Sequence, residues 1–291
     1  MKNYIKMFLA GVFLAAALPF TLVLLINGRQ GIHQEKQLDP VDYQVLQQML
    51  TEDLSWMSDD TLKLLAVLYR TEALRVGEPE TVPLTELYGE QYERVYTAVE
   101  STAGMAVTID GEYRELPFHK VSAGQTRDGQ LLGDGYDYVL SVECREDKEA
   151  SDYVQICTLS LGEMLQALGV DHIVEEAAED IAEKDAADGQ TEMKEITIDD
   201  FTFQRDSEGY VESVSLGDQI WTGEAFRSLL HFPSSCFWMK MDTERVTITI
   251  KGVGHGFGIS LYTADRRIRE GTPWQDIFSC FYKNAQCITI P

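Results

Sequence analysis

An uncharged, apolar run from Met7 to Ile26 constrains this chain more than any other feature of its sequence. Twenty apolar residues in a helix are long enough to cross the hydrocarbon core of a bilayer. Lys2 and Lys6 precede the run, and flanking cations favour the cytosolic side. We therefore expect a single-pass protein of the cell membrane. Its expected parts are a cytoplasmic tip and transmembrane anchor (1–29), a stalk (30–40) and an extracytoplasmic domain (41–291).

A cleavable signal peptide is the alternative interpretation of this run. Ala15 and Ala17 offer the small-residue pattern that precedes a cleavage site. The apolar stretch continues well past them without a polar region, which favours an uncleaved anchor.

The chain carries 24 Lys and Arg against 48 Asp and Glu, a formal net charge of -24. Such a charge repels phosphate backbones, so we expect no nucleic-acid partner. Hydrophobic residues make up 44% of the chain, which excludes disorder along its whole length. Twelve of the acidic residues lie within residues 171–200, and this composition predicts an acidic surface insertion at about 171–195.

A helical hairpin is expected at the start of the extracytoplasmic part. Asp39 and Pro40 are typical of a helix start, and this first helix should run to about Thr51. Ser58 is a good cap for a second helix, which Gly77 should end. The connecting loop, from Glu52 to Met57, carries an acid and a tryptophan.

The rest of the chain alternates between short apolar runs and turns, so the predicted fold class is α+β, with a strand-rich region after the hairpin. The expected strands are Met105–Ile109, which the Asp110–Gly111 turn ends, Tyr136–Val142, Glu195–Phe203, Tyr210–Leu216 and Val246–Ile250. The expected helices are Ser160–Leu168, Thr222–Leu230 and Gly271–Lys283.

Two segments have the composition of binding loops. Glycine occupies every second position around His255 in the segment from Lys251 to Ser260, which lets a ligand approach the backbone. A glycine-rich turn with a core histidine explains the same pattern. The segment from Phe118 to Thr126 is polar and rich in small residues and follows a predicted strand.

The five cysteines form no CxxC pair and have no spacing typical of structural zinc. Most are expected to be buried as small apolar residues, and Cys280 and Cys287 are the pair closest in sequence. We expect no metal and no cofactor.

Taken together, these segments resemble the stage II sporulation protein D family (SpoIID/LytB domain), which also includes amidase enhancers. The resemblance covers about Val41 to Tyr282 in four blocks. In the first block the matched residues are Leu50 to Glu52, Trp56, Leu62, Lys63, Ala66, Val67, Arg70 and Thr71. In the second they are Phe118, His119, Ser122, Gly124, Thr126, Tyr138, Ser141 and Val142. The third matches at Gly223, Phe226, Arg227, Leu230, Ser234 and Phe237, and the fourth at Lys251 to Ser260, Tyr262 and Ala264.

Three departures mark the chain as a divergent member of the family it resembles. Leu54 stands where the family has proline, and Leu64 and Leu65 replace an alanine–glutamine pair. The family's S-Q-Y-G-A has become Ser260 to Ala264 with Leu261 in place of glutamine.

The resemblance implies a lytic transglycosylase that cleaves peptide-stripped peptidoglycan glycan strands to 1,6-anhydro-muramyl products during engulfment in sporulation. It implies as partners a cell-wall amidase and a membrane protein of the engulfment machinery. Glu52 occupies the catalytic acid/base position, and the substrate-binding residues would be Arg70, His119, Ser122, Lys251 and His255.

Two other functions stay open at this point. A non-catalytic scaffold that enhances a cell-wall amidase is consistent with the loss of the proline and of the glutamine at position 261. A hydrolase that makes reducing ends would need a second carboxylate to position water.

Overall fold

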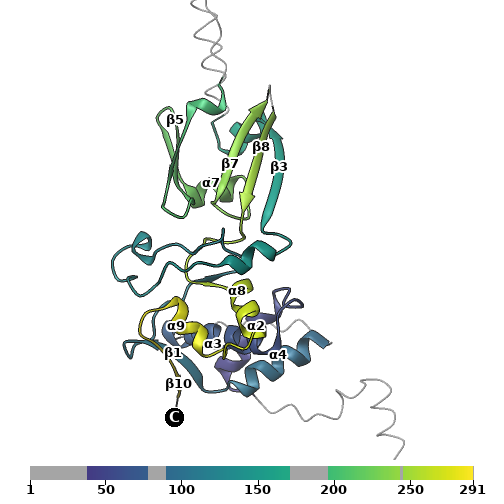
Figure 1. Ribbon diagram of the computed structural model, residues 1–291, viewed down its shortest axis with the longest axis vertical. Helices are drawn as coiled ribbons and strands as arrows, with labels where there is room; N and C mark the ends of the chain where they lie inside the picture. Colours follow the sequence, from purple (N-terminus) through teal and green to yellow (C-terminus); the bar gives the residue numbers. More distant parts are fainter. Residues whose placement is uncertain (1–37, 78–89, 171–195, 243–244, 291) are drawn as a thin grey trace, which may run out of the picture. The chain divides into compact units, whose positions relative to one another are not determined.

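The structure is a computed structural model that describes residues 38–77, 90–170, 196–242 and 245–290. Its first elements are the helices α2 (Pro40–Leu50), α3 (Asp59–Val76) and α4 (Glu90–Ser101), which pack on one another (Figure 1). The Ser58 side chain accepts a hydrogen bond from the backbone N–H of Thr61 and caps α3. Gly77 ends α3 in the left-handed conformation, with its N–H donating to the Ala73 carbonyl. The predicted helical hairpin is confirmed.

A two-stranded sheet adjoins these helices. Strand β1 (Met105–Ile109) pairs antiparallel with β10 (Ala285–Thr289), from the other end of the chain. The Val107 N–H donates to the Thr71 hydroxyl of α3 at 2.9 Å, which ties β1 to that helix. Residues far apart in sequence therefore complete the helical part of the fold.

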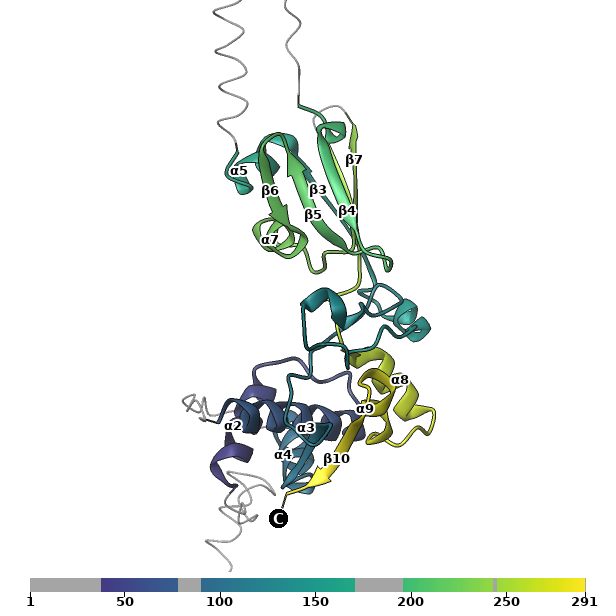
Figure 2. The same ribbon diagram turned by 90° about the vertical axis from the view of Figure 1, so that its left-hand side faces the viewer.

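Two three-stranded antiparallel sheets enclose an apolar core. One has the order β3 (Val154–Ser160), β8 (Arg245–Lys251), β7 (Phe237–Asp242), and the other the order β4 (Phe201–Arg205), β5 (Val211–Leu216), β6 (Gln219–Thr222). Helices α5 (Leu161–Ala167) and α7 (Gly223–Leu229) belong to the same region (Figure 2). The core is built from both sheets and both helices and includes Met164, Val214, Phe226, Phe237 and Ile248.

The glycine-rich segment runs against the segment from Pro117 to Ser122. Strand β9 (Ile259–Ser260) pairs in parallel with β2 (Phe118–His119). Gly252, Gly254, Gly256 and Gly258 all have positive φ angles. A Cβ atom at Gly258 would lie 1.7 Å from the Pro117 carbonyl oxygen, so only glycine permits this approach. The glycines therefore shape the backbone here.

Helices α8 (Leu261–Arg269) and α9 (Asp276–Phe281) follow β9. The predicted helix Gly271–Lys283 is thus shorter than expected, and α8 was not predicted. The remaining helical turns are the 3₁₀ elements η2 (Gly129–Leu132), η3 (Arg145–Glu149) and η4 (Ile198–Asp200).

One predicted strand is wrong and one is shifted. Residues Tyr136–Val142 form no strand, because within them only Val139 makes an isolated bridge, to Tyr282. The strand expected from Glu195 begins at Phe201, after η4. The strands and helices expected around Met105, Tyr210, Val246, Ser160 and Thr222 are confirmed within a residue or two.

The fold of the described residues is α+β, as predicted. The expected anchor Met7–Ile26, most of the stalk and the acidic insertion 171–195 lie outside the described residues. Among the helices of the described ranges, none combines the length and the apolar character that a membrane span requires.

Candidate active site

Glu52 lies on the loop between α2 and α3, and the backbone of this loop is firmly held. Leu54 and Met57 are buried beneath it. From α4, the Gln91 amide donates to the Glu52 carbonyl at 2.9 Å, and the Arg94 guanidinium donates to the Met57 carbonyl at 2.6 Å. The loop therefore presents an exposed Glu52 carboxylate from a fixed backbone.

The Tyr69 hydroxyl of α3 donates a hydrogen bond to Oε1 of Glu52. Burial, followed by the hydrogen bond to Glu52, raises the pKa of the Tyr69 phenol well above its usual value, so the phenol keeps its proton and acts as the donor. The Tyr69 ring meets the Phe118 ring edge to face at 5.5 Å between centroids. One packed aromatic side chain thus orients the carboxylate.

The Glu52 loop and the segment around His119 together line a cavity of about 360 Å³. Its lining residues are Glu52, Asp53, Trp56, Met57, Phe118, His119, Lys120 and Leu261. Two acids, one cation, one imidazole and two aromatic rings therefore meet around one space, which is the usual composition of a site for a polar ligand with apolar faces.

An aromatic platform lies at this cavity. The Trp56 ring stacks on the Tyr262 ring at 6.1 Å with an interplanar angle of 28°. The Lys120 ammonium lies 6.0 Å from the centroid of the Trp56 ring and forms a 2.6 Å ion pair with Asp152. An ammonium has three donors, so Lys120 can bind a further anion while it keeps Asp152.

His119 is 4% exposed and neutral. Burial, and next the neighbouring His255, lower the pKa of His119 to about 3. Its Nδ1 lies 3.0 Å from the Phe257 carbonyl oxygen, which only accepts, so Nδ1 carries the proton and Nε2 a lone pair. Within the described part of the chain, buried Nε2 has no hydrogen-bond partner. His119 lines the cavity, but its Nε2 lone pair is buried behind the cavity surface.

His255 lies against His119, with 5.6 Å between ring centroids. Its Nδ1 accepts a hydrogen bond from the Phe257 N–H at 3.1 Å, and burial lowers its pKa. The structure thus brings Glu52 and His119 together in the cavity lining, and His255 contacts His119 without lining the cavity.

The buried His119 predicts a pH-dependent stability. Because its pKa is about 3 in the folded chain and near 6.5 in the unfolded chain, only the unfolded chain takes up this proton between those values. The free energy of unfolding should therefore fall as the pH drops below about 6.5, with about 1.4 kcal/mol per pH unit attributable to His119.

Urea unfolding of the parent and of His119→Gln at pH 7, 6 and 5 measures this contribution. His255, with a lowered pKa, acts in the same direction, and Asp147, with a raised pKa, acts in the opposite one. Both are present in each protein, so the difference in slope reports His119 together with its electrostatic coupling to His255. Equal slopes would contradict the neutral, buried imidazole.

Ser122 is buried below the cavity segment and takes part in an internal network. Its N–H donates to the Asp147 carboxylate at 2.7 Å, and its hydroxyl accepts from the Gly124 N–H at 3.1 Å. The hydroxyls of Ser260 and Thr263 also donate to Asp147, each at 2.8 Å. Ser122 therefore holds the fold and is absent from the cavity lining.

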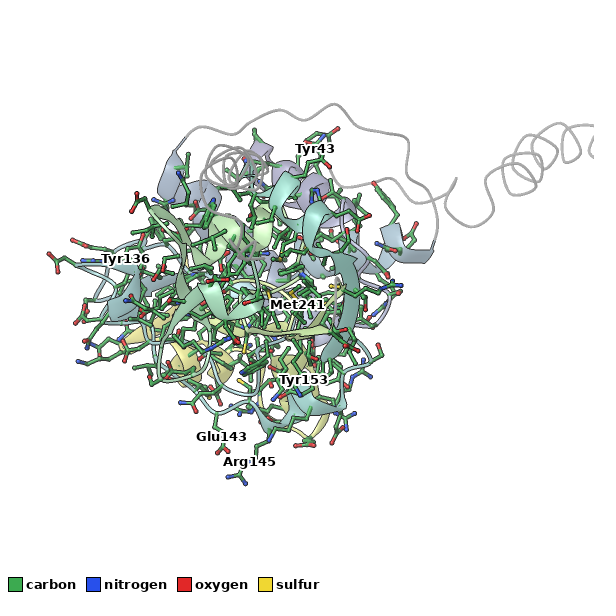
Figure 3. The ribbon with its side chains drawn as sticks, turned by 90° about the horizontal axis from the view of Figure 1, so that it is seen from above. Tyr43, Tyr136, Glu143, Arg145, Tyr153 and Met241 are labelled. Atoms are coloured by element: carbon green, nitrogen blue, oxygen red, sulfur yellow. The ribbon has the colours of Figure 1, made fainter. Side chains whose placement is uncertain are left out.

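Asp147 is a buried acid that no sequence motif indicates. Burial raises its pKa, although its hydrogen bonds oppose that shift. It lies on η3, whose first residue, Arg145, forms an exposed 2.7 Å ion pair with Glu143, and this pair projects outward in Figure 3. Through its hydrogen bonds, the Asp147 carboxylate links η3 to the segment around Ser122 and to the start of α8.

Arg70 was expected to contact the substrate, but in the structure its side chain has a structural role. The Arg70 side chain is 3% exposed and donates to the Asp42 carboxylate at 2.6 Å. Its other hydrogen bonds go to the Thr102 hydroxyl and to the carbonyl oxygens of Val99 and Met105. It joins α2, α3, α4 and β1 and does not line the cavity.

Lys251 also lies apart from the cavity lining. It ends β8, and its ammonium lies 4.9 Å from the centroid of the Trp238 ring on β7. Lys251, which matches the glycine-rich block of the family, therefore lies on the three-stranded sheet and not in the cavity.

Sequence reasoning did not identify Tyr69 and Lys120 as site residues. Tyr69 belongs to the apolar stripe of α3, so its spacing indicates a core position. Its hydroxyl was the available sign that it does more than pack in the core. Lys120 is next to His119 in sequence, and that adjacency was the available signal.

The described residues contain no group of three or more His, Cys, Asp or Glu side chains arranged to hold a metal ion. All five cysteines are free thiols. Cys280 is exposed, and Cys144 and Cys236 are buried.

Two curated proteins are similar to this chain. Stage II sporulation protein D of Bacillus subtilis (strain 168) is 26% identical over 208 residues, which are 70% of this chain and 54% of the relative. Stage II sporulation protein D of Bacillus amyloliquefaciens is 26% identical over 199 residues, 68% of this chain and 52% of the relative. The chain thus spans about half the length of these relatives. No family model matches the chain.

Proposed function

Because this chain belongs to the stage II sporulation protein D family, we propose that it acts on the cell wall in sporulation, as a lytic transglycosylase of peptide-stripped glycan strands. One observation carries the proposal. The Glu52 carboxylate, oriented by the Tyr69 hydroxyl, lines a cavity that also offers the Trp56 ring and the Lys120 ammonium. The match of Glu52 to the family's acid/base position supports the same assignment.

The reaction needs one acid that acts twice. Protonated Glu52 gives its proton to the glycosidic oxygen as the bond from the muramyl C1 breaks. The carboxylate then accepts the proton of the muramyl 6-hydroxyl as that oxygen bonds to C1 and closes the 1,6-anhydro ring. The proton count balances, and no water enters.

Asp53, the second acid of the cavity, fits a different role. The Ser55 hydroxyl and N–H both donate to its carboxylate and lower its pKa. Asp53 therefore stays ionised near neutral pH, and it is a candidate to stabilise positive charge that develops on the sugar ring.

The other lining groups suit a muramyl sugar. The Trp56 ring lines the cavity and stacks on the Tyr262 ring, so it offers an apolar surface for a sugar face. Lys120 can pair with the lactyl carboxylate that amidase removal of the stem peptide exposes.

Product mass tests this function. The full-length protein is incubated with purified peptide-free glycan strands, and the products are analysed by mass spectrometry. Anhydro ends, lighter by one water than reducing ends, are the expected result. Reducing ends would identify a hydrolase.

The second candidate function is a non-catalytic amidase enhancer. Leu261 lines the cavity where the family has glutamine, which removes a polar contact from the site and favours this alternative. A parent protein that never cleaves but stimulates an amidase would establish it.

Lys120→Met should raise KM for peptide-free strands about two- to fivefold and leave kcat almost unchanged. An exposed charge pair contributes up to about 1 kcal/mol, and here it acts in binding rather than in bond cleavage. Steady-state kinetics on strands with free and with amidated lactyl carboxylates measure the effect. Lys148→Met, at an exposed lysine of η3, is the control. Equal KM values for parent and Lys120→Met would exclude the carboxylate contact.

We also propose the setting of this activity. The apolar run 7–26 would anchor the protein in the cell membrane with the domain outside the cytoplasm. Peptide-free strands require a partner amidase, and the implied membrane partner belongs to the engulfment machinery.

A further inference from the structure

The sheet β3–β8–β7 has one face in the core and one face open. Along β8, Val246, Ile248 and Ile250 are buried, and the residues between them point outward. The register places Ile156 and Trp238 on either side of outward Thr249, so all three strands contribute to the open face. The three strands lie side by side in Figure 1.

This open face is apolar at its centre. Ile156 is 69% exposed, Val154 46% and Trp238 39%, and all three lie at outward positions of the sheet. Adjacent exposed apolar residues on one flat surface are typical of a binding surface rather than of isolated surface residues.

The same face is basic. Its outward positions include Lys240, Arg245 and Lys251. Arg245 lies opposite Asp242 in the register and also interacts electrostatically with Glu163, so the two lysines supply the excess positive charge. Neither Lys240 nor Lys251 forms an ion pair with a described residue. The chain as a whole has a net charge of -24 and repels anions. This face is locally positive, so it attracts them.

We propose that this face, defined by Val154, Ile156, Trp238, Lys240, Arg245 and Lys251, is a second glycan site that binds a peptide-free strand through its carboxylates. The inference rests on the proposed function for the identity of the polymer. It assigns a surface whose residues do not line the Glu52 cavity.

The geometry favours an extended polymer. Lys240 is opposite Thr247, four residues along β8 from Lys251, which separates the two lysine positions by about 13 Å along the strand. Two cations at that separation can contact carboxylates on different sugars of one strand. Thr247 and Thr249 add outward hydroxyls between them, and Ile156 and Trp238 add apolar surface for sugar faces.

Co-sedimentation with insoluble peptide-free glycan, cleared of phosphate-containing polymers, tests the proposal. All proteins are full length and carry Glu52→Gln, so cleavage does not interfere. Reversing both lysines, Lys240→Glu with Lys251→Glu, should weaken binding about tenfold at low salt, since each exposed charge contributes up to about 1 kcal/mol. Binding by the unreversed protein should fall as salt rises.

The matched control reverses two exposed lysines elsewhere, Lys148→Glu with Lys283→Glu, and changes the net charge by the same amount. If both pairs lose binding equally, the cause is general charge repulsion between protein and glycan, and the proposal is overturned. It is also overturned if neither pair loses binding. Thermal unfolding identifies misfolded variants. If the reversed pair misfolds, Lys240→Gln with Lys251→Gln replaces it and should also bind less, whereas Lys240→Arg with Lys251→Arg should bind like the parent.

Two further arms test the ligand. Glycan with amidated carboxylates should bind less, and equal binding would overturn the carboxylate contact. A polyglutamate chain that competes better than soluble glycan would identify an acidic polypeptide as the ligand instead. Cleavage is measured separately. If the parent protein has no lytic activity, the proposed enzymatic function is wrong, but the binding result still stands. If the reversed pair binds as well as the unreversed protein, only the second glycan site is wrong.

Discussion

Glu52→Gln should cleave peptide-free glycan strands about 100-fold more slowly than the parent, or slower still, and should bind them almost as well. The substitution keeps the size of the side chain and a hydrogen-bonding partner for Tyr69 but removes the titratable proton. Loss of general acid–base catalysis lowers kcat more than it changes KM. Initial rates from reducing-end and anhydro-end analysis, together with strand co-sedimentation, measure both quantities.

Glu72→Gln is the matched control for this variant. Glu72 lies on α3 and forms an exposed ion pair with Arg75, so its loss should change cleavage little. If Glu52→Gln and Glu72→Gln both cleave like the parent, Glu52 is not the acid.

Arg70→Met should lower the free energy of unfolding by about 3–5 kcal/mol, because it leaves the Asp42 carboxylate buried without its cation. Two backbone carbonyls and one hydroxyl also lose the donor. Urea unfolding, monitored by near-ultraviolet circular dichroism, measures the change.

Arg75→Met on the same helix provides the comparison, because the exposed pair of Arg75 with Glu72 contributes about 0.5 kcal/mol or less. Adding Asp42→Leu to Arg70→Met should recover part of the lost stability. A stable Arg70→Met that binds strands poorly would restore the substrate contact that the family resemblance implies.

The elements that the sequence predicts well are those with local stop and start signals. Ser58 and Gly77 bound α3, Ser160 caps α5 through a capping box, and Asp110 with Gly111 ends β1. Each signal depends on hydrogen bonds or φ angles within a few residues, so neighbours in the chain suffice to set it.

Elements that depend on distant partners were predicted poorly. Tyr136–Val142 has the composition of a strand, yet Tyr282 offers it only one bridge. Strand β10 exists because β1, about 180 residues earlier, pairs with it.

By itself, the sequence determined the α+β class, the helical hairpin and the position of Glu52 on the loop between its helices. Tertiary structure decided what surrounds that acid: it brings Tyr69, His119 and Lys120 to it and places Arg70 in a buried ion pair with Asp42. The physical reason is that caps, turns and periodicity act over one helical turn, whereas a site is defined by side chains that pack together from different elements. Burial, which sets the charge of His119 and the role of Arg70, exists only once those elements have packed.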